Sequence, residues 1–225
     1  MIKNGALKDY IRYQLDKTND YFSEYDLEKI TEVYLDYNDT DEFDFTELLD
    51  LVNLSDLTLR NYKIDNDNLY KLLMITELKK LTLDNCILND SCIVLASLSL
   101  DTLSINNCNL PNYDFIYLID SLRSLHITNS NVDIRKLNKL RKLEYLDLTN
   151  SNINDLNNKL ELNNLIKLHI ENTNIKDLSI IENTNIKELS IDREQIENNK
   201  EIIHRLINND VVILDEGITV LNEVI

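Results

Sequence analysis

Apolar residues recur along the chain as Leu-x-x-Leu-x-Leu, with isoleucine in some positions, at a nearly constant interval. The clearest copies begin at Leu54, Leu78, Leu100, Leu122, Leu143, Leu165 and Ile186. Successive copies start 24, 22, 22, 21, 22 and 21 residues apart. Within each copy the last two apolar residues are separated by one residue, which is the spacing of a short strand that buries one side.

A period in the low twenties with this pattern is typical of a leucine-rich repeat, in which each turn of a solenoid contributes one strand. The sequence therefore predicts an α/β fold, a right-handed leucine-rich-repeat solenoid (horseshoe) with a parallel concave sheet of about eight or nine strands. The repeats are expected to occupy residues 30–196, and the first strand follows the pattern that begins at Ile30.

The first 29 residues do not follow the repeat. Leu7, Tyr10, Ile11 and Leu15 have helical spacing, and Ser23 with Asp26 predicts the start of a second short helix. A solenoid needs a cap with a polar outer side over the apolar edge of its first turn. Residues 1–29 are therefore predicted to form a helical N-terminal cap, packed by most of the tyrosines that cluster early in the chain: Tyr10, Tyr13, Tyr21, Tyr25, Tyr34 and Tyr37.

Helical spacing also appears between and after the strands. The segments 66–75, 90–98 and 113–121 are predicted to return as short helices on the side opposite the sheet. Residues 197–225 are predicted to form a C-terminal helix, from Glu197 to Asn209, and a degenerate capping repeat at 211–214. Cap, repeats and C-terminal segment are expected to form one continuous domain.

The segments from Leu7 to Leu15 and from Tyr25 to Val33 resemble the cap that opens many bacterial leucine-rich-repeat proteins of the internalin type. Two later repeats resemble the same type, in Asn152-Ile153-x-Asp155-Leu156 and Asn174-Ile175-x-Asp177-Leu178. The resemblance implies the fold and a protein-binding role. No signal peptide, immunoglobulin-like junction domain or surface anchor is recognisable, so the resemblance does not extend to cell adhesion.

The chain is strongly acidic, with a formal net charge of −17. A field of this sign repels phosphate backbones and argues against nucleic-acid binding, whereas it attracts a protein that carries a basic patch. Acidity that only keeps an apolar solenoid soluble is the competing interpretation. No apolar run is long enough to span a membrane, and a cytoplasmic location is expected.

Three cysteines bear on the same question. Cys86 and Cys108 occupy the ninth position of consecutive repeats, where the side chain is expected to point inward, and Cys92 lies in an apolar stretch. A bridge between Cys86 and Cys108 is geometrically possible, because adjacent turns lie ~5 Å apart. Three buried free thiols in a reducing compartment are the preferred interpretation.

The strand pattern predicts columns of equivalent residues on the concave side. The first column is Tyr34, Thr58, Thr82, Ser104, His126, Asp147, His169, Ser190 and Val212, and the second is Asp36, Arg60, Asp84, Asn106, Thr128, Thr149, Glu171 and Asp192. A third consists of asparagines: Asn61, Asn85, Asn107, Asn129, Asn150 and Asn172. Because the third column does not vary, it is interpreted as a structural hydrogen-bonded ladder.

His126, Asp147 and His169 stand on three consecutive strands, and two functions compete for them. Imidazole and carboxylate groups a few Å apart could bind zinc or form a general base. A shallow face without a pocket or supporting residues favours protein contact instead. The residues predicted to bind a partner are Tyr34, Tyr37, Arg60, Asp84, Ser104, His126, Asp147, His169, Glu171 and Asp192.

The predicted function is a non-enzymatic protein–protein interaction module, with no catalytic residue, metal or cofactor assigned. An acidic immunity or inhibitor protein that neutralises a basic toxin or enzyme is the alternative. Such a protein would have one tight partner, and its association would slow steeply with salt. A metal-binding protein or enzyme using His126, Asp147 and His169 is the remaining possibility.

Overall fold

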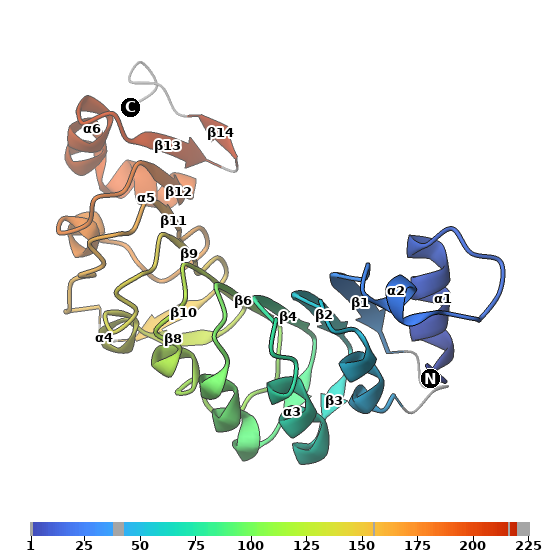
Figure 1. The fold of residues 1–225 in the computed structure, drawn as a ribbon. Coiled ribbons are helices and arrows are strands. Elements are labelled where there is room, and N and C mark those ends of the chain that lie inside the picture. The colour runs from blue at the N-terminus through green and yellow to red at the C-terminus, as the bar shows by residue number, and fades with distance from the viewer. Residues whose placement is uncertain (1, 38–42, 155, 216, 220–225) are drawn as a thin grey trace. The chain divides into compact units, whose positions relative to one another are not determined.

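The structure of the 225-residue protein is a computed structural model, which describes residues 2–37, 43–154, 156–215 and 217–219. The chain divides into two compact units, Met1–Ile119 and Asp120–Ile225. In both units, strands alternate with short helices and turns along the chain (Figure 1). Each repeat of the sequence therefore contributes a strand and a return segment, as predicted.

In the first unit, parallel strands hydrogen-bond in chain order: β1 (Glu32–Asp36), β2 (Asp56–Arg60), β4 (Lys80–Asp84) and β6 (Thr102–Asn106). Their register places inward apolar residues side by side, since Val33 pairs with Leu57 and Leu57 with Leu81. These three side chains are 2% exposed or less. The alternating side chains point to solvent, and we call the solvent side of the strands in either unit the sheet face.

The return segments of the first unit contain short helices and a minor pair of parallel strands. They are η1 (Phe45–Asp50), β3 (Lys63–Ile64), α3 (Asn66–Leu73), β5 (Ile87–Leu88), η2 (Asp90–Ser97) and η3 (Ile116–Leu118). The helix predicted at 66–75 is confirmed as α3, whose N-cap Asp65 accepts a hydrogen bond from the N–H of Asn68. The two other predicted helices are 3₁₀ pieces, which suit short connections better than α-helix.

The N-terminal cap consists of α1 (Gly5–Gln14) and α2 (Glu24–Leu27). Leu7 and Ile11 are fully buried on one side of α1, and Ser23 and Asp26 form the predicted capping box of α2. The prediction that the early tyrosines mostly pack the cap is wrong for three of them. Tyr13, on α1, is 83% exposed, because Leu7 and Ile11 form the buried side of that helix, and Tyr21 and Tyr25, around α2, are 75% and 68% exposed.

In the second unit the parallel strands are β7 (Ser124–Thr128), β9 (Tyr145–Asp147), β11 (Lys167–His169), β12 (Glu188–Ile191) and β13 (Val212–Asp215). Antiparallel strand β14 (Ile218–Thr219) pairs with β13. The return segments contain β8 (Asn131–Asp133), α4 (Ile134–Leu137), β10 (Asn152–Asn154) and η4 (Leu178–Ile181). Asp155, which belongs to one of the internalin-like motifs, lies outside the described residues.

The C-terminal helix begins earlier than predicted and is broken. Asp192 forms a capping box with Gln195 and starts α5 (Arg193–Asn198), which Asn199 separates from α6 (Lys200–Asn208). The predicted column position of Val212 is also wrong, because Ser190 pairs with Leu214 and Val212 pairs with Glu188. The register of the last strand therefore lies two residues from the predicted one. A shift of two residues keeps each side chain on its face, and Val211 and Ile213 stay buried.

The asparagine column ends the strands with a left-handed residue in each repeat. Its members have positive φ: Asn61 (62°), Asn85 (53°), Asn107 (50°), Asn129 (53°), Asn150 (59°) and Asn172 (54°). Asparagine tolerates this conformation better than other residues with a side chain. In the first unit the predicted ladder is confirmed, since the Nδ2 groups of Asn107, Asn85 and Asn61 donate to Asn85, Asn61 and Asp36 at 3.2, 2.6 and 2.6 Å.

Inward polar side chains bond the backbone of neighbouring repeats. The thiols of Cys86 and Cys108 donate to the carbonyls of Leu59 and Leu83, both at 3.3 Å. The hydroxyl of Ser151 donates to the carbonyl of Ile127 at 2.9 Å. The three cysteines are free: Cys86 and Cys92 are buried, and Cys108 is partly buried. The ninth position therefore satisfies backbone groups that would otherwise be buried without partners.

Within residues 2–37, 43–154, 156–215 and 217–219, no helix is both long and apolar enough to cross a bilayer.

Candidate functional site

A group of polar and aromatic side chains gathers on the sheet face of the second unit. We call it the sheet-face cluster, and it consists of Ser124, His126, Tyr145, Asp147, His169 and Glu188. The register brings His126 and His169 on either side of Asp147 as Cα partners, as the columns predicted. Strands β7, β9, β11 and β12 therefore supply the site, and their buried leucines fix its spacing.

Tyr145 occupies the middle of the cluster. Its ring centroid lies 4.7 Å from that of His126 and 5.1 Å from that of His169, with near-perpendicular planes of 87° and 75°. Its hydroxyl lies 3.1 Å from Nδ1 of His169. Edge-to-face packing of this kind is favourable, and it holds the three rings in one arrangement.

Burial and nearby acidic groups act on Tyr145 in the same direction. Burial, followed by the negative charges of Asp147, Glu188 and Glu171, raises the pKa of the Tyr145 hydroxyl to about 12. The hydroxyl therefore stays protonated at neutral pH, so it keeps its proton available to a hydrogen-bond acceptor.

Asp147 is anchored from two sides. Its Oδ1 accepts hydrogen bonds from the hydroxyl of Thr149 at 2.7 Å and the backbone N–H of Thr149 at 3.0 Å, and its Oδ2 lies 3.6 Å from Nδ1 of His126. Burial pushes the pKa of Asp147 upward, but hydrogen bonds from His126 and Thr149 outweigh burial and lower it overall. The carboxylate is therefore charged and held in place at neutral pH.

The far side of the cluster is also paired. Glu188 lies 3.0 Å from Nζ of Lys167 and 3.4 Å from Nε2 of His169. The hydrogen bond from Lys167 is the largest influence on Glu188 and lowers its pKa, with His169 acting in the same direction against burial. Glu171 accepts a hydrogen bond from the hydroxyl of Ser190 at 2.6 Å. The acidic groups of this face thus have partners within the protein.

The geometry separates the three residues considered for metal binding or catalysis. Asp147 faces His126, whereas His169 contacts Tyr145 and Glu188, and the Tyr145 ring lies between the two imidazoles. Among the residues that the structure describes, no group of three or more His, Cys, Asp or Glu side chains is arranged to hold a metal ion. The side chains can offer an ordered surface with donors, acceptors and aromatic rings.

The first unit contains five of the residues predicted to bind a partner, and four of them lie on or near β1, β2 and β4. Tyr34 is 47% exposed on β1 and hydrogen-bonds Arg60, and this bond is the largest cause of a raised Arg60 pKa. Arg60 also lies 3.3 Å from Asp84. Tyr37 lies beyond the end of β1 and packs on Tyr62, with ring centroids 5.4 Å apart. Tyr34, Arg60 and Asp84 therefore share one surface, while Tyr37 belongs to an aromatic group beside it.

Two residues predicted to contact a partner, Ser104 and Asp192, have structural roles or are buried instead. Ser104 is buried, with 9% of its surface exposed. Asp192 caps α5 by accepting the N–H of Gln195 at 2.9 Å and also accepts the N–H of Asn172 at 3.0 Å. Ser104 is therefore less accessible to a partner protein, and Asp192 has fewer free acceptor positions, than their column positions predicted.

Three members of the cluster were not singled out from the sequence. Ser124, Tyr145 and Glu188 lie two residues before the first column, on the other side of the inward leucine. Side chains two apart on a strand share a face, so this extra column could have been deduced from the same repeat. The sequence signal for this column was Tyr145, an aromatic residue on the strand that lies between the strands of His126 and His169.

Solved structures of known proteins share this arrangement of strands. An internalin C2 from Listeria monocytogenes is 22% identical, and the match covers 83% of this chain and 92% of that protein with a TM-score of 0.57. The fold is a leucine-rich-repeat solenoid of the internalin type. Listeria monocytogenes InlP has the same fold at 15% identity, over 84% of this chain and 64% of its own, with a TM-score of 0.53.

The internalin-type repeat explains the columns of the sheet face, and the predicted fold class is confirmed. No family model and no curated protein matches the sequence. At these identities the likeness concerns the fold, and function depends on the residues of the site.

Proposed function

We propose that this internalin-type repeat protein is a non-enzymatic protein-binding module whose partner docks on the sheet face of the second unit. The ordered Tyr145 ring between His126 and His169 is the observation that carries the proposal. Tyrosine is enriched among residues that dominate binding energy, because its ring gives large contact area at low entropic cost. Asp147 and Glu188 hold the neighbouring histidines, so the surface is preorganised.

A partner with a basic patch fits the charge of the protein best. The net charge of −17 supports long-range attraction and faster association. Asp147 and Glu171 already have internal partners, so they offer less to a direct ion pair than exposed carboxylates would. We therefore expect salt to reduce the association rate more than it changes dissociation. A single tight partner with a steep salt dependence would favour the immunity or inhibitor alternative.

Affinity capture with the full chain identifies the partner, and interferometry on the pair then compares Tyr145→Ala with Tyr70→Ala. Tyr70 is a matched control, because it is 56% exposed but lies on α3, in a return segment. We expect Tyr145→Ala to weaken binding about 30-fold, as loss of a binding hot spot of ~2 kcal/mol would. Tyr70→Ala should bind like the parent protein.

Lys167→Glu provides a second variant that preserves the buried core, since Lys167 is half exposed beside Glu188. If the cluster is the contact, this charge reversal should change the affinity, and a partner with a basic patch should bind more tightly because the surface becomes more negative. The thermal midpoint should change little, because Lys167 is on the surface. Unchanged affinity in both Tyr145→Ala and Lys167→Glu, with both proteins folded, would exclude the sheet face of the second unit as the docking site.

A further inference from the structure

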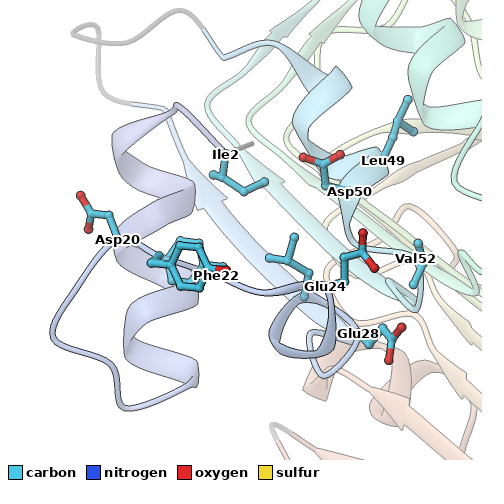
Figure 2. A pocket seen from close by; sticks show the side chains of 10 residues that line it. Ile2, Asp20, Phe22, Glu24, Glu28, Leu49, Asp50 and Val52 are labelled. Atoms are coloured by element: carbon cyan, nitrogen blue, oxygen red, sulfur yellow. The ribbon is translucent and has the colours of Figure 1, made fainter.

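A pocket lies in the N-terminal cap of the first unit, and none of its lining residues belongs to the sheet-face cluster. Its volume is about 510 Å³, and three parts of the chain line it: Ile2 near the N-terminus, residues 20–28 around α2, and residues 49–52 at the end of η1. Figure 2 shows Glu24 between Asp50 and Glu28 in this view, with Val52 beside them. None of the functions assigned above uses this pocket.

Hydrogen bonds clamp the three segments together. Glu47 on η1 accepts the backbone N–H groups of Lys3 and Asn4 at 2.8 and 2.9 Å, which ties the N-terminal segment to η1. The side chain of Asn53 donates to the carbonyl of Glu28 at 2.7 Å and ties α2 to the same region. The pocket is therefore formed before a ligand arrives, which lowers the entropic cost of binding.

The pocket combines an acidic rim with an apolar lining. Its rim carries the carboxylates of Asp20, Glu24, Glu28 and Asp50, while Ile2, Phe22, Leu27, Leu49 and Val52 supply apolar surface. Val52 is 58% exposed and Tyr21, at the edge, is 75% exposed, which is a high exposure for large apolar side chains.

Two of the carboxylates are available for a ligand. Asp20 lies 3.3 Å from Arg12, but in the part of the chain described by the structure Glu24 and Glu28 have no ion-pair partner. They are four residues apart around α2, so their side chains lie on neighbouring positions of one side. The capping box and the Lys17–Asp26 ion pair at 2.5 Å fix the helix that presents them.

We propose that this pocket binds an arginine-containing, amphipathic segment of a partner protein. Arginine places a long apolar stem against apolar surface while its guanidinium remains at the polar rim, which matches the lining and rim of the pocket. The planar guanidinium can donate hydrogen bonds to two carboxylates, and Glu24 and Glu28 lie one helical turn apart at the rim. A purely apolar segment would leave these charges partly desolvated without partners.

The probe for a test is a six-residue peptide that alternates arginine and leucine, and the control peptide has citrulline in place of arginine. Titration into the ¹⁵N-labelled full chain should shift amide resonances of Phe22, Glu24, Glu28 and Val52. Glu24→Gln/Glu28→Gln should weaken binding about tenfold, at about threefold for each partly exposed charge pair. The citrulline peptide should bind as weakly as the double variant does to arginine.

A double variant with the same charge change at a distance, Glu77→Gln/Glu201→Gln, controls for overall electrostatics, because both residues are exposed outside the cap. It should bind within about twofold of the parent protein. Equal weakening by both double variants, or shifts confined to the sheet-face cluster, would overturn the pocket assignment. A peptide response at the cap leaves the proposal for the sheet face to its own test, so either can fail alone.

Discussion

Two repeats of the first unit have thiols at the inward polar position, Cys86 and Cys108, and two repeats of the second have hydroxyls there, Ser130 and Ser151. Cys108 donates to Leu83 at 3.3 Å, and Ser151 donates to Ile127 at 2.9 Å. The neighbouring backbone N–H also bonds the same atoms, from Cys86 to Cys108 at 3.4 Å and from Ser130 to Ser151 at 3.3 Å. The position thus requires a small group that both donates and accepts, rather than one residue type.

The side chains on the sheet faces of the two units differ more in their chemistry than the thiols and hydroxyls at the inward position do. After Tyr34, the first column of the first unit continues with Thr58, Thr82 and Ser104. In the second unit it consists of His126, Asp147, His169 and Ser190, with Tyr145 beside them. Interior positions therefore tolerate chemical exchange while the outer face distinguishes one unit from the other. This contrast supports the proposal that a partner binds the outer face of the second unit.

The largest expected effect comes from placing a charge in the core of one unit. Leu146 is fully buried, so Leu146→Asp should cost several kcal/mol. Hydrogen exchange should show loss of protection in β7, β9 and β11, with slow exchange retained in β2 and β4. Leu81→Asp is the matched change in the first unit, where the pattern should reverse. Loss of protection throughout the chain in both variants would show that the units do not unfold separately.

Exchanging atoms at the inward position should have an intermediate effect. Ser151→Ala removes the partner of the Ile127 carbonyl and the Ser130 N–H, and should lower the free energy of unfolding by about 1–3 kcal/mol. Ser151→Cys should cost less than Ser151→Ala, because a thiol can replace both bonds weakly. Urea unfolding measures each value. Equal losses in the two variants would break the equivalence of thiol and hydroxyl.

The strand-end asparagines should show a smaller difference between units. Asn85→Ala should cost about 1–2 kcal/mol, because alanine is less tolerant of φ 53° and breaks the ladder to Asn61. Asn150→Gly should change stability by less than about 0.5 kcal/mol, since glycine adopts φ 59° readily. Thermal denaturation of the two asparagine-to-glycine variants, Asn85→Gly and Asn150→Gly, measures the ladder. If Asn85→Gly is as stable as Asn150→Gly, the ladder contributes little.

The smallest effect is confined to alkaline pH. The folded protein holds the pKa of Tyr145 at about 12, above its ordinary value of 10.0, so the folded state keeps a proton that the unfolded state loses. The contribution of the protonated Tyr145 hydroxyl to the free energy of unfolding is complete below pH 10.0 and is lost as the pH rises toward about 12. Tyrosinate absorbance should show a late step that Tyr145→Phe removes and Tyr70→Phe retains. A normal titration of every tyrosine would contradict the described burial of Tyr145.

The register of the sheet was predictable because a two-residue strand period and a fixed repeat leave few alternatives. His126, Asp147 and His169 came together for that reason. Tyr145 and Glu188 belong to a column on the other side of the inward leucine, and a search limited to the centre of each strand does not reach it. Val212 was misplaced because its repeat lacks the leucine spacing that sets the register.

Contacts between distant segments were harder to predict. Ser104 is buried although its column position predicts exposure, and the role of Asp192 depends on a helix that starts at Arg193. The cap pocket combines Ile2 with residues 20–28 and 49–52, and no periodic pattern relates these segments. The repeat pattern thus predicts the features that recur in every turn. The features of a single turn depend on contacts with segments that are distant in the sequence.

The left-handed asparagine at the end of the strands also bears on how such a chain can change its length in evolution. Because Asn61, Asn85, Asn107, Asn129, Asn150 and Asn172 each reverse the backbone locally, a repeat carries its own turn with it. Duplication or deletion of one repeat of 21 to 24 residues then leaves the turns of its neighbours intact. Gene rearrangement can therefore add or remove the outward-facing side chains of one strand at a time without changing the backbone conformation of the neighbouring repeats.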